Sequence, residues 1–419
     1  MRRGSSPGGS ARPSWSISRV WNPSFLWRPV MSGWWRPASS MAAIPSTAAC
    51  GSSRSTAVSP RVRTSRVTTT WSRRTTCPGS LSRRSRPTAT GSSQVRNTGI
   101  EFPEQGRIAT YDLGQIPELK PTEVLLRTQY SAITNGTERH ALLGEMRWAG
   151  GFPGRHGYQH VGQIQAAGEA VEKFSPGDTL FCGRYVGHRS WQVVDLSPGT
   201  NRREGDHLCV NLPGDVEPGQ CALLGVMGVA LRGVRRFRIA PGQKIWVAGQ
   251  GLIGHFAAQV ARCFGAHVTV SDVVDHRLDV AGRCGAHRVI DVRETASWAA
   301  IEEAGPFDCI IDACGQDGLL AELHTRQLLA PGGVIGVLAV HDEVRISWGL
   351  LHRCEASVEV SCHFSVEDLD VLIHFLQQDM IRVEPVITHA VAIDAAPELY
   401  ALLRDRPGDL LGVVFDWAA

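Results

Sequence analysis

The strongest constraint on the fold is an alternation of short apolar strands and helices that begins at residue 244. Strand-like runs such as KIWVAG, HVTVSD, CIIDACG and GVIGVLAV are separated by helical stretches. Strands this apolar are buried on both faces, and connecting helices make such strands parallel. The pattern predicts a doubly wound α/β domain, with helices over residues 252–264, 276–284, 297–303 and 319–329.

A glycine-rich turn stands between the first of these strands and the first helix. Gly249, Gly251 and Gly254 form a GxGxxG pattern after the strand 244–248. The first glycine permits a tight turn, the second lets the backbone approach a pyrophosphate, and the third lets helix and strand pack closely. The free N–H groups of the helix, which opens with Leu252 and Ile253, then face the phosphates. The strand and helix context predicts a dinucleotide site.

The end of the second strand indicates which dinucleotide binds. Asp272 lies 18 residues beyond Gly254, where a carboxylate accepts hydrogen bonds from adenosine ribose hydroxyls and repels a 2′-phosphate. We therefore expect NAD, with NADP as the less favoured cofactor. Arg277 follows closely and could weaken this preference or stack on the adenine.

Residues 1–100 differ sharply in composition from the rest of the chain. They contain 16 Arg and six Trp but no Lys, Asp or Glu, so their net charge is +16, against −13 for residues 101–419. With little Leu, Ile and Val they cannot offset chain entropy, and we expect disorder over residues 1–97. A transit peptide, a basic arm and a segment from an over-extended or out-of-frame start are the alternatives. The complete absence of Lys and acids favours the last.

The acidic remainder gives no reason to expect a nucleic-acid partner. No run of 18 uncharged apolar residues exists, so the sequence predicts no membrane span. The 11 cysteines are scattered, odd in number and without CxxC pairs. They indicate reduced thiols in a cytoplasmic protein and not a disulfide framework.

Several segments together resemble the medium-chain dehydrogenase/reductase superfamily, which contains the zinc-type alcohol dehydrogenases. They are TEVLLR (122–127), SAITNGTE (131–138), GYQHVG (157–162), SPGD (175–178), WVAGQGLIG, FDCIIDACG (307–315) and LLAPGGVIGVLA (328–339). The SAITNGTE wording is most similar to the bacteriochlorophyllide-dehydrogenase-like subgroup. The resemblance implies a Rossmann domain inserted into a β-rich GroES-like catalytic domain. The expected segments are 98–224 (catalytic), 225–354 (Rossmann) and 355–419 (catalytic).

The resemblance also implies site residues. Ala313, Cys314, Leu338 and Ala339 follow the strands that line the nicotinamide half of the site. The zinc ligands of the family are missing together: Asn135 stands where a Cys belongs, and Gly157-Tyr158-Gln159 replaces Gly-His-Glu. We therefore expect no zinc, and the remaining doubt concerns four side chains that could form a different site: His156, His160, Cys182 and His188.

Without a metal, other groups must polarise a carbonyl or carry a proton. Thr137 matches the family's hydroxyl relay, Tyr158 could donate to an oxyanion, and His160 or His188 could pass a proton to water. Glu138 matches an acid that orients its neighbours.

We expect an NAD(H)-dependent oxidoreductase that interconverts a small-molecule alcohol and a carbonyl by hydride transfer. A zinc-free enone or quinone reductase and a nucleotide-binding protein that has lost catalysis are the alternatives. The apolar strand GVIGVLAV suggests edge-to-edge pairing into a homodimer.

Overall fold

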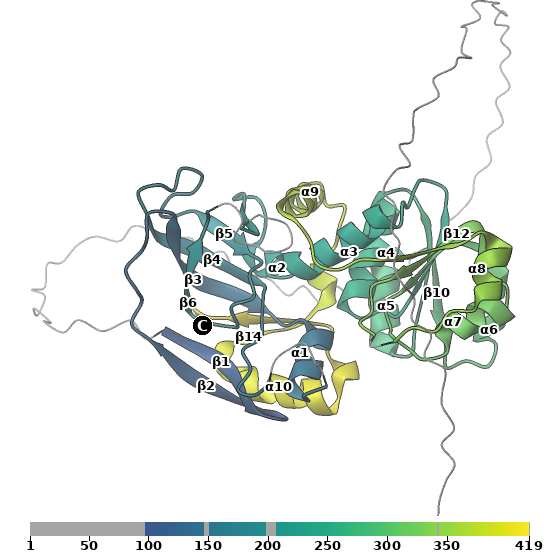
Figure 1. Ribbon diagram of the computed structural model, residues 1–419, viewed down its shortest axis with the longest axis horizontal. Helices are drawn as coiled ribbons and strands as arrows, with labels where there is room; N and C mark the ends of the chain where they lie inside the picture. Colours follow the sequence, from purple (N-terminus) through teal and green to yellow (C-terminus); the bar gives the residue numbers. More distant parts are fainter. Residues whose placement is uncertain (1–96, 146–150, 198–206, 342, 419) are drawn as a thin grey trace, which may run out of the picture. The chain divides into compact units, whose positions relative to one another are not determined.

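The computed structural model describes residues 97–145, 151–197, 207–341 and 343–418, all in one compact unit (Figure 1). The disorder expected for residues 1–97 lies outside the described residues, except that Asn97 opens the first strand. Within the described residues, no helix has the length and apolar character needed to cross a membrane.

A six-stranded sheet forms the core of the Rossmann part. Every strand pairing in it is parallel. Its spatial order is β10 (Arg288–Asp291), β9 (His267–Asp272), β8 (Lys244–Ala248), β11 (Phe307–Asp312), β12 (Leu329–Val337) and β13 (Ser357–Val360). Chain order reverses between β8 and β11, which are neighbours, and ligands of such sheets bind outside the strand ends at this point. The predicted doubly wound sheet is confirmed.

Helices cover both faces of this sheet (Figure 1). One face packs on three helices, α3 (Leu224–Arg236), α4 (Leu252–Cys263) and α5 (Asp275–Arg283). The other face packs on α6 (Ser297–Ala304), α7 (Leu319–Thr325) and α8 (Trp348–Cys354). Alternate residues of β8 point to opposite faces, so Ile245 and Val247 join one core while Trp246 and Ala248 join the other. Burial on both faces explains why these strands are continuously apolar.

Three expectations for this part need correction. Strand β12 is interior, because β13 pairs with it, so the edge strand on this side of the sheet is β13 and not GVIGVLAV. For the same reason the Rossmann sheet continues past the boundary expected at residue 354. The helix expected over residues 319–329 ends at Thr325, since Gln327 adopts a left-handed conformation (φ 55°) that stops it.

The β-rich part is built on a second sheet and a hairpin. The hairpin pairs β1 (Asn97–Glu104) with β2 (Arg107–Gly114). The sheet has the order β14 (Ile387–Ala392), β15 (Gly412–Asp416), β3 (Glu123–Ala132), β4 (His160–Ala167), β5 (Thr179–Cys182) and β7 (Cys209–Asn211), with β6 (Trp191–Asp195) also on β3. Its first and last parts in sequence meet where β15 pairs with β3, as expected of a split domain.

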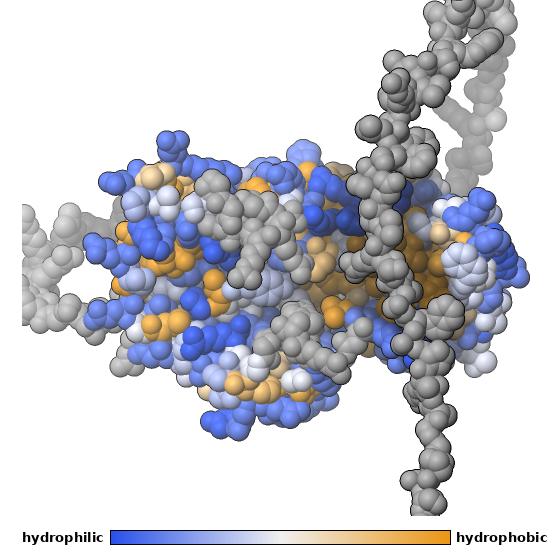
Figure 2. Space-filling model, viewed as in Figure 1, coloured by the Kyte–Doolittle hydropathy of each residue, from blue (hydrophilic) through white to orange (hydrophobic). Residues whose placement is uncertain are grey.

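Shorter elements complete this part. The helices are α1 (Asn135–Leu142), α2 (Pro218–Cys221), α9 (Val366–Gln377) and α10 (Ala396–Asp405), with 3₁₀ turns at Glu384–Val386, Ile393–Ala395 and Pro407–Asp409. In Figure 2, the visible apolar atoms gather in a recessed area over the part that carries α4 and β10.

Candidate active site

The glycine turn after β8 has the shape that a dinucleotide requires. Gly249 is left-handed (φ 94°), and a Cβ on Gly254 would lie 1.9 Å from the Gly249 carbonyl oxygen. At Gly251, by contrast, a Cβ would meet nothing within 4 Å. Gly251 precedes α4, and no side chain caps the first turn of that helix. The turn therefore offers open space and unsatisfied N–H groups to an anion.

Asp272 ends β9 next to this turn. Its carboxylate accepts hydrogen bonds from the backbone N–H groups of Gln250 (2.6 Å), Val273 (2.7 Å) and Val274 (2.9 Å). Since a carboxylate has about four acceptor positions, one is left for a ribose hydroxyl. Arg277 does not point its Nη2 at a nucleotide: that atom donates to the carbonyl oxygens of Pro407 (3.0 Å) and Leu410 (3.2 Å).

The residues after β11 and β12 lie beside the glycine turn. The Ala313 N–H donates to the Ala248 carbonyl oxygen at 2.9 Å, and a Cβ on Gly249 would lie 2.7 Å from Cβ of Cys314. The N–H groups of Leu338 and Ala339 both donate to the Asp312 carbonyl oxygen. The structure thus brings the sequence-predicted cofactor residues of three strand ends together.

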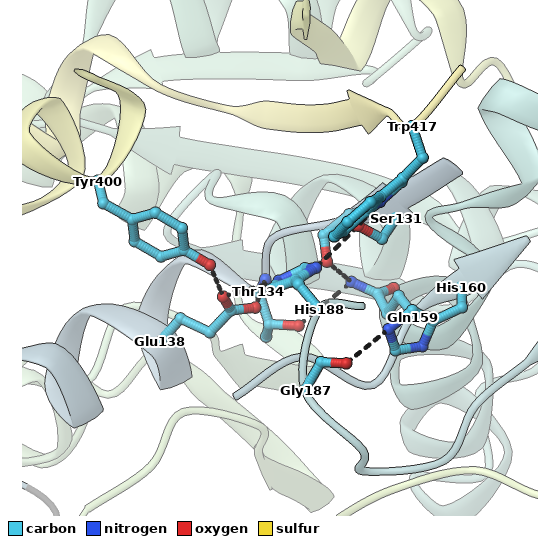
Figure 3. Close-up of polar contacts among 10 residues, drawn as sticks. Ser131, Thr134, Glu138, Gln159, His160, Gly187, His188, Tyr400 and Trp417 are labelled. Carbon is cyan, nitrogen blue, oxygen red and sulfur yellow. Dashed lines mark hydrogen bonds and ion pairs between the residues drawn. The ribbon is translucent and has the colours of Figure 1, made fainter. Parts of the chain in front are cut away.

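A buried polar cluster lies in the β-rich part (Figure 3). We call it the Glu138 cluster; its members are Ser131, Glu138, His188, Tyr400 and Trp417. Glu138 accepts from the Tyr400 hydroxyl and pairs with Nε2 of His188 (3.1 Å), whose Nδ1 lies 2.8 Å from Oγ of Ser131. The indole N–H of Trp417 donates to the same Oγ at 2.9 Å. The cluster joins β3, α1, α10 and the chain end.

The electrostatics of the Glu138 cluster follow from its burial. Burial alone would raise the pKa of Glu138, but the charge of His188 and the hydrogen bonds from His188, Tyr400 and the Thr134 N–H together hold that pKa below its ordinary value. Burial and the neighbouring Glu138 carboxylate raise the pKa of Tyr400 well above its ordinary value. Glu138 is thus a buried carboxylate that its donors keep ionised.

The three residues expected to act in catalysis have different environments. Thr137 lies half-buried in the first turn of α1. Tyr158 is buried, with its ring 4.6 Å from that of Tyr185, and burial raises the pKa of its phenol. His160 is fully buried on β4, where Nε2 lies 3.1 Å from the Gly187 carbonyl oxygen.

The setting of His160 argues against a role in passing protons to water. Burial, followed by the charge of His188, lowers the pKa of His160 to about 3, so its ring is neutral at neutral pH. His188 is equally buried and belongs to the Glu138 cluster. Both histidines are buried in the β-rich core.

Thr134 is a neighbour of Tyr158 that the sequence analysis did not name. Its Oγ1 accepts a hydrogen bond from Nε2 of Gln159 at 3.2 Å, and its side chain also bonds the Tyr158 hydroxyl. It stands in the same SAITNGTE segment that drew attention to Thr137. No local pattern could reveal Tyr400 or Trp417, because they reach the site from 262 and 286 residues away in sequence.

The donor set at the family's zinc position does not fit zinc. Nδ2 of Asn135 donates to the Leu411 carbonyl oxygen, and Oε1 of Gln159 accepts from the Val226 N–H. Across the residues that the structure describes, no three His, Cys, Asp or Glu side chains gather as a metal site. This also holds for the four residues considered as a different site, His156, His160, Cys182 and His188.

Comparisons with known proteins agree with this fold. The family model for zinc-binding dehydrogenases matches residues 253–378. The L-threonine 3-dehydrogenase of Deinococcus deserti is 27% identical over 331 residues, which cover 72% of this chain and 94% of that protein.

Two solved structures show the same fold. The alcohol dehydrogenase of Thermus sp. ATN1 has a TM-score of 0.65 and 20% identity, over 77% of this chain and 99% of that one. An alcohol dehydrogenase of Escherichia coli CFT073, solved with NADH, has a TM-score of 0.66 and 20% identity over the same shares. NAD(P) binding is typical of these proteins. In sequence and in fold, the chain is similar to medium-chain, alcohol dehydrogenase-like oxidoreductases.

Proposed function

We propose that this protein is an NAD(H)-dependent oxidoreductase that interconverts a small-molecule alcohol and a carbonyl compound. One observation carries the proposal: the space beyond Gly251 is open at the uncapped start of α4, next to the carboxylate of Asp272. A pyrophosphate fits the first feature and a ribose diol the second. When bound, the nicotinamide supplies the hydride chemistry, and the chain supplies binding and orientation.

We propose NAD over NADP. The one acceptor position left on Asp272 suits a hydroxyl and would repel a 2′-phosphate. Arg277, the nearest cation to that carboxylate, stays 3.9 Å away while its Nη2 bonds two carbonyl oxygens. Arg277 therefore offers little positive charge to offset the repulsion between Asp272 and the 2′-phosphate of NADP. Titration of the purified protein with NADH and NADPH, followed by nicotinamide fluorescence, should give the lower Kd for NADH.

We propose that the reaction proceeds without catalytic zinc. The support is the donor set described above, in which amide side chains that already bond the backbone occupy ligand positions. Metal analysis of the active protein should find less than stoichiometric zinc. Activity that is lost with a chelator and restored by zinc would overturn this part of the proposal.

We propose that Tyr158 and Thr137 supply hydrogen bonds that take the place of a catalytic metal. A phenol whose pKa is raised by burial stays protonated, so Tyr158 can donate a hydrogen bond to a developing oxyanion. The variants Tyr158→Phe and Thr137→Val should lower kcat with saturating NADH, whereas the exposed neighbour variant Tyr185→Phe should not. Unchanged kcat in both site variants would remove these roles.

The substrate class is tested by measuring turnover with a panel of candidate compounds. A panel would contain L-threonine, small diols, simple ketones and conjugated enones. NADH oxidation by ketones supports the alcohol–carbonyl reaction, and oxidation by enones alone would show the reductase alternative. NADH binding without turnover across the panel would indicate a protein that has lost catalysis. The resemblance to the bacteriochlorophyllide-dehydrogenase-like subgroup has no part in this proposal, because the relatives do not support it.

We propose that two copies pair through β13. This edge strand exposes Val358 (37%) and Val360 (60%), and unpaired N–H and C=O groups of such an edge favour another strand. Light scattering should give a dimer for the unmodified chain and a monomer for Val360→Lys. A monomeric parent protein would contradict the proposal. We also propose a reducing, cytoplasmic location, which fits the described cysteines because none of them is joined in a disulfide.

A further inference from the structure

A pair of side chains, Asp312 and His341, joins the ends of two strands, and the proposed function gives this pair no role. Asp312 is the last residue of β11, and its side chain is 1% exposed. Its Oδ1 accepts hydrogen bonds from the N–H groups of Cys314 (3.1 Å) and Gly315 (2.9 Å). Its Oδ2 lies 2.9 Å from Nε2 of His341, which follows β12.

The pair lies at the point where the strand order reverses. β11 is the neighbour of β8, whose glycine turn contacts Cys314. A Cβ on Gly315 would lie 3.4 Å from Cβ of Ala339 and 3.8 Å from Cε1 of His341. The imidazole therefore stands beside the loops that follow β11 and β12. In a doubly wound sheet these two strands belong to the second nucleotide-binding half, opposite the adenosine half at β8 and β9.

The way the ring is held indicates a ligand contact. Asp312 already has two backbone donors, so it does not need His341 to satisfy its Oδ1. The carboxylate holds one ring nitrogen and thereby fixes the orientation of the imidazole, as second partners of functional histidines do. The other edge of the ring, with Nδ1, is the part that can bond a ligand, and the His341 side chain remains 12% exposed.

We propose that His341, positioned by Asp312, hydrogen-bonds the nicotinamide-ribose half of the bound dinucleotide. This inference rests on the proposed function, because it requires dinucleotide binding at the glycine turn. It makes His341 a cofactor-binding residue and Asp312 a positioning residue that acts through it.

The test compares a whole dinucleotide with its adenosine half. Kd values for NADH and 5′-AMP would be measured calorimetrically for the unmodified protein, His341→Ala and the exposed control His352→Ala. We expect His341→Ala to weaken NADH about tenfold, the loss of roughly one good hydrogen bond, and to leave 5′-AMP within about twofold. His352→Ala should change neither Kd.

The positioning role of Asp312 needs a double-mutant cycle. Asp312→Asn keeps an oxygen for Cys314 and Gly315 but loses the charge that faces His341. It should weaken NADH in the unmodified background and have little further effect in His341→Ala. An equal effect in both backgrounds would show that Asp312 does not act through His341.

The remaining outcomes are also decisive. Parallel weakening of NADH and 5′-AMP by His341→Ala would show a merely structural pair, and an unchanged NADH Kd would show no contact; either result overturns the inference. If the unmodified protein bound neither NADH nor 5′-AMP, the proposed function would fail and the inference with it. Unmodified binding with no effect of His341→Ala would remove the inference alone.

Discussion

The glycine turn and the Glu138 cluster place functional groups in opposite ways. The turn is built from six consecutive residues, and it offers backbone N–H groups and empty space. The Glu138 cluster is built from side chains up to 286 residues apart, and four of its five members are buried. A site that uses backbone can be encoded locally. A buried network of charged and polar side chains depends on the completed β-rich fold.

The largest effect is expected at the glycine turn, where substitutions of two glycines should have different effects on NADH binding and stability. Gly254→Ala forces a Cβ against the Gly249 carbonyl oxygen. It should weaken NADH binding by about a hundredfold or more, and it should also lower the melting temperature. Gly251→Ala has open space for its Cβ and should fold normally while losing about tenfold in NADH affinity.

Gly282→Ala on α5 is the control for these glycines. Its Cβ would meet only Val289 at 3.9 Å, and it should leave NADH binding unchanged. Circular dichroism and fluorescence titration would separate the cases. Unaltered NADH affinity in Gly251→Ala would mean that no phosphate approaches the turn.

The next largest effect is expected in the Glu138 cluster. Glu138→Gln leaves His188 and Tyr400 buried opposite an uncharged amide, and it should lower the free energy of unfolding by about 3–5 kcal/mol. The control is Glu145→Gln, whose exposed ion pair with His140 is worth under about 1 kcal/mol. Urea denaturation measures both. Similar losses in the two variants would show that the cluster is not a stabilising network.

A pH dependence is expected from one buried histidine in each region. The pKa values of His160 in the β-rich part and His255 on α4 are both lowered to about 3 by burial. Between pH 6.5 and 3 the unfolded chain binds protons that the folded chain does not. The free energy of unfolding should therefore fall, as pH falls through this range, by up to about 1.4 kcal/mol per pH unit for each histidine.

Single substitutions assign this slope to a region. His160→Gln should remove the contribution of one proton from the slope of the free energy of unfolding against pH. His255→Gln should remove the same contribution independently. Urea titrations at several pH values would provide the slopes. A slope that neither variant changes would mean that both rings are protonated in the folded state.

The smallest effect is expected at the chain end. Trp417→Phe keeps the ring but removes the N–H that bonds Ser131, and it should cost about 1 kcal/mol of stability. Trp348→Phe is the control, since Trp348 is 75% exposed and far from this cluster in sequence. If both substitutions had the same effect in thermal denaturation, the Trp417 bond would contribute nothing measurable.

Much of the fold could be predicted because its signals are local. The parallel sheet follows from apolar strands such as β8 and β11, which alternate with helices, and the helix expected over residues 252–264 forms as α4. The edge of the sheet could not be predicted, because β12 and the short β13 differ in their neighbours and not in local pattern. The environments of Tyr158 and His160 also depended on other segments, which bring the Phe364 ring to Tyr158 and the Gly187 carbonyl oxygen to His160.

The sequence by itself determined the glycine turn and the strand end that carries Asp272. These features need only a few neighbouring residues, because backbone conformation and residue type decide them. The tertiary structure decided that Glu138 meets Tyr400 and that His341 meets Asp312. The physical reason is that a buried charge needs partners, and only the closed fold brings them from the far ends of the chain.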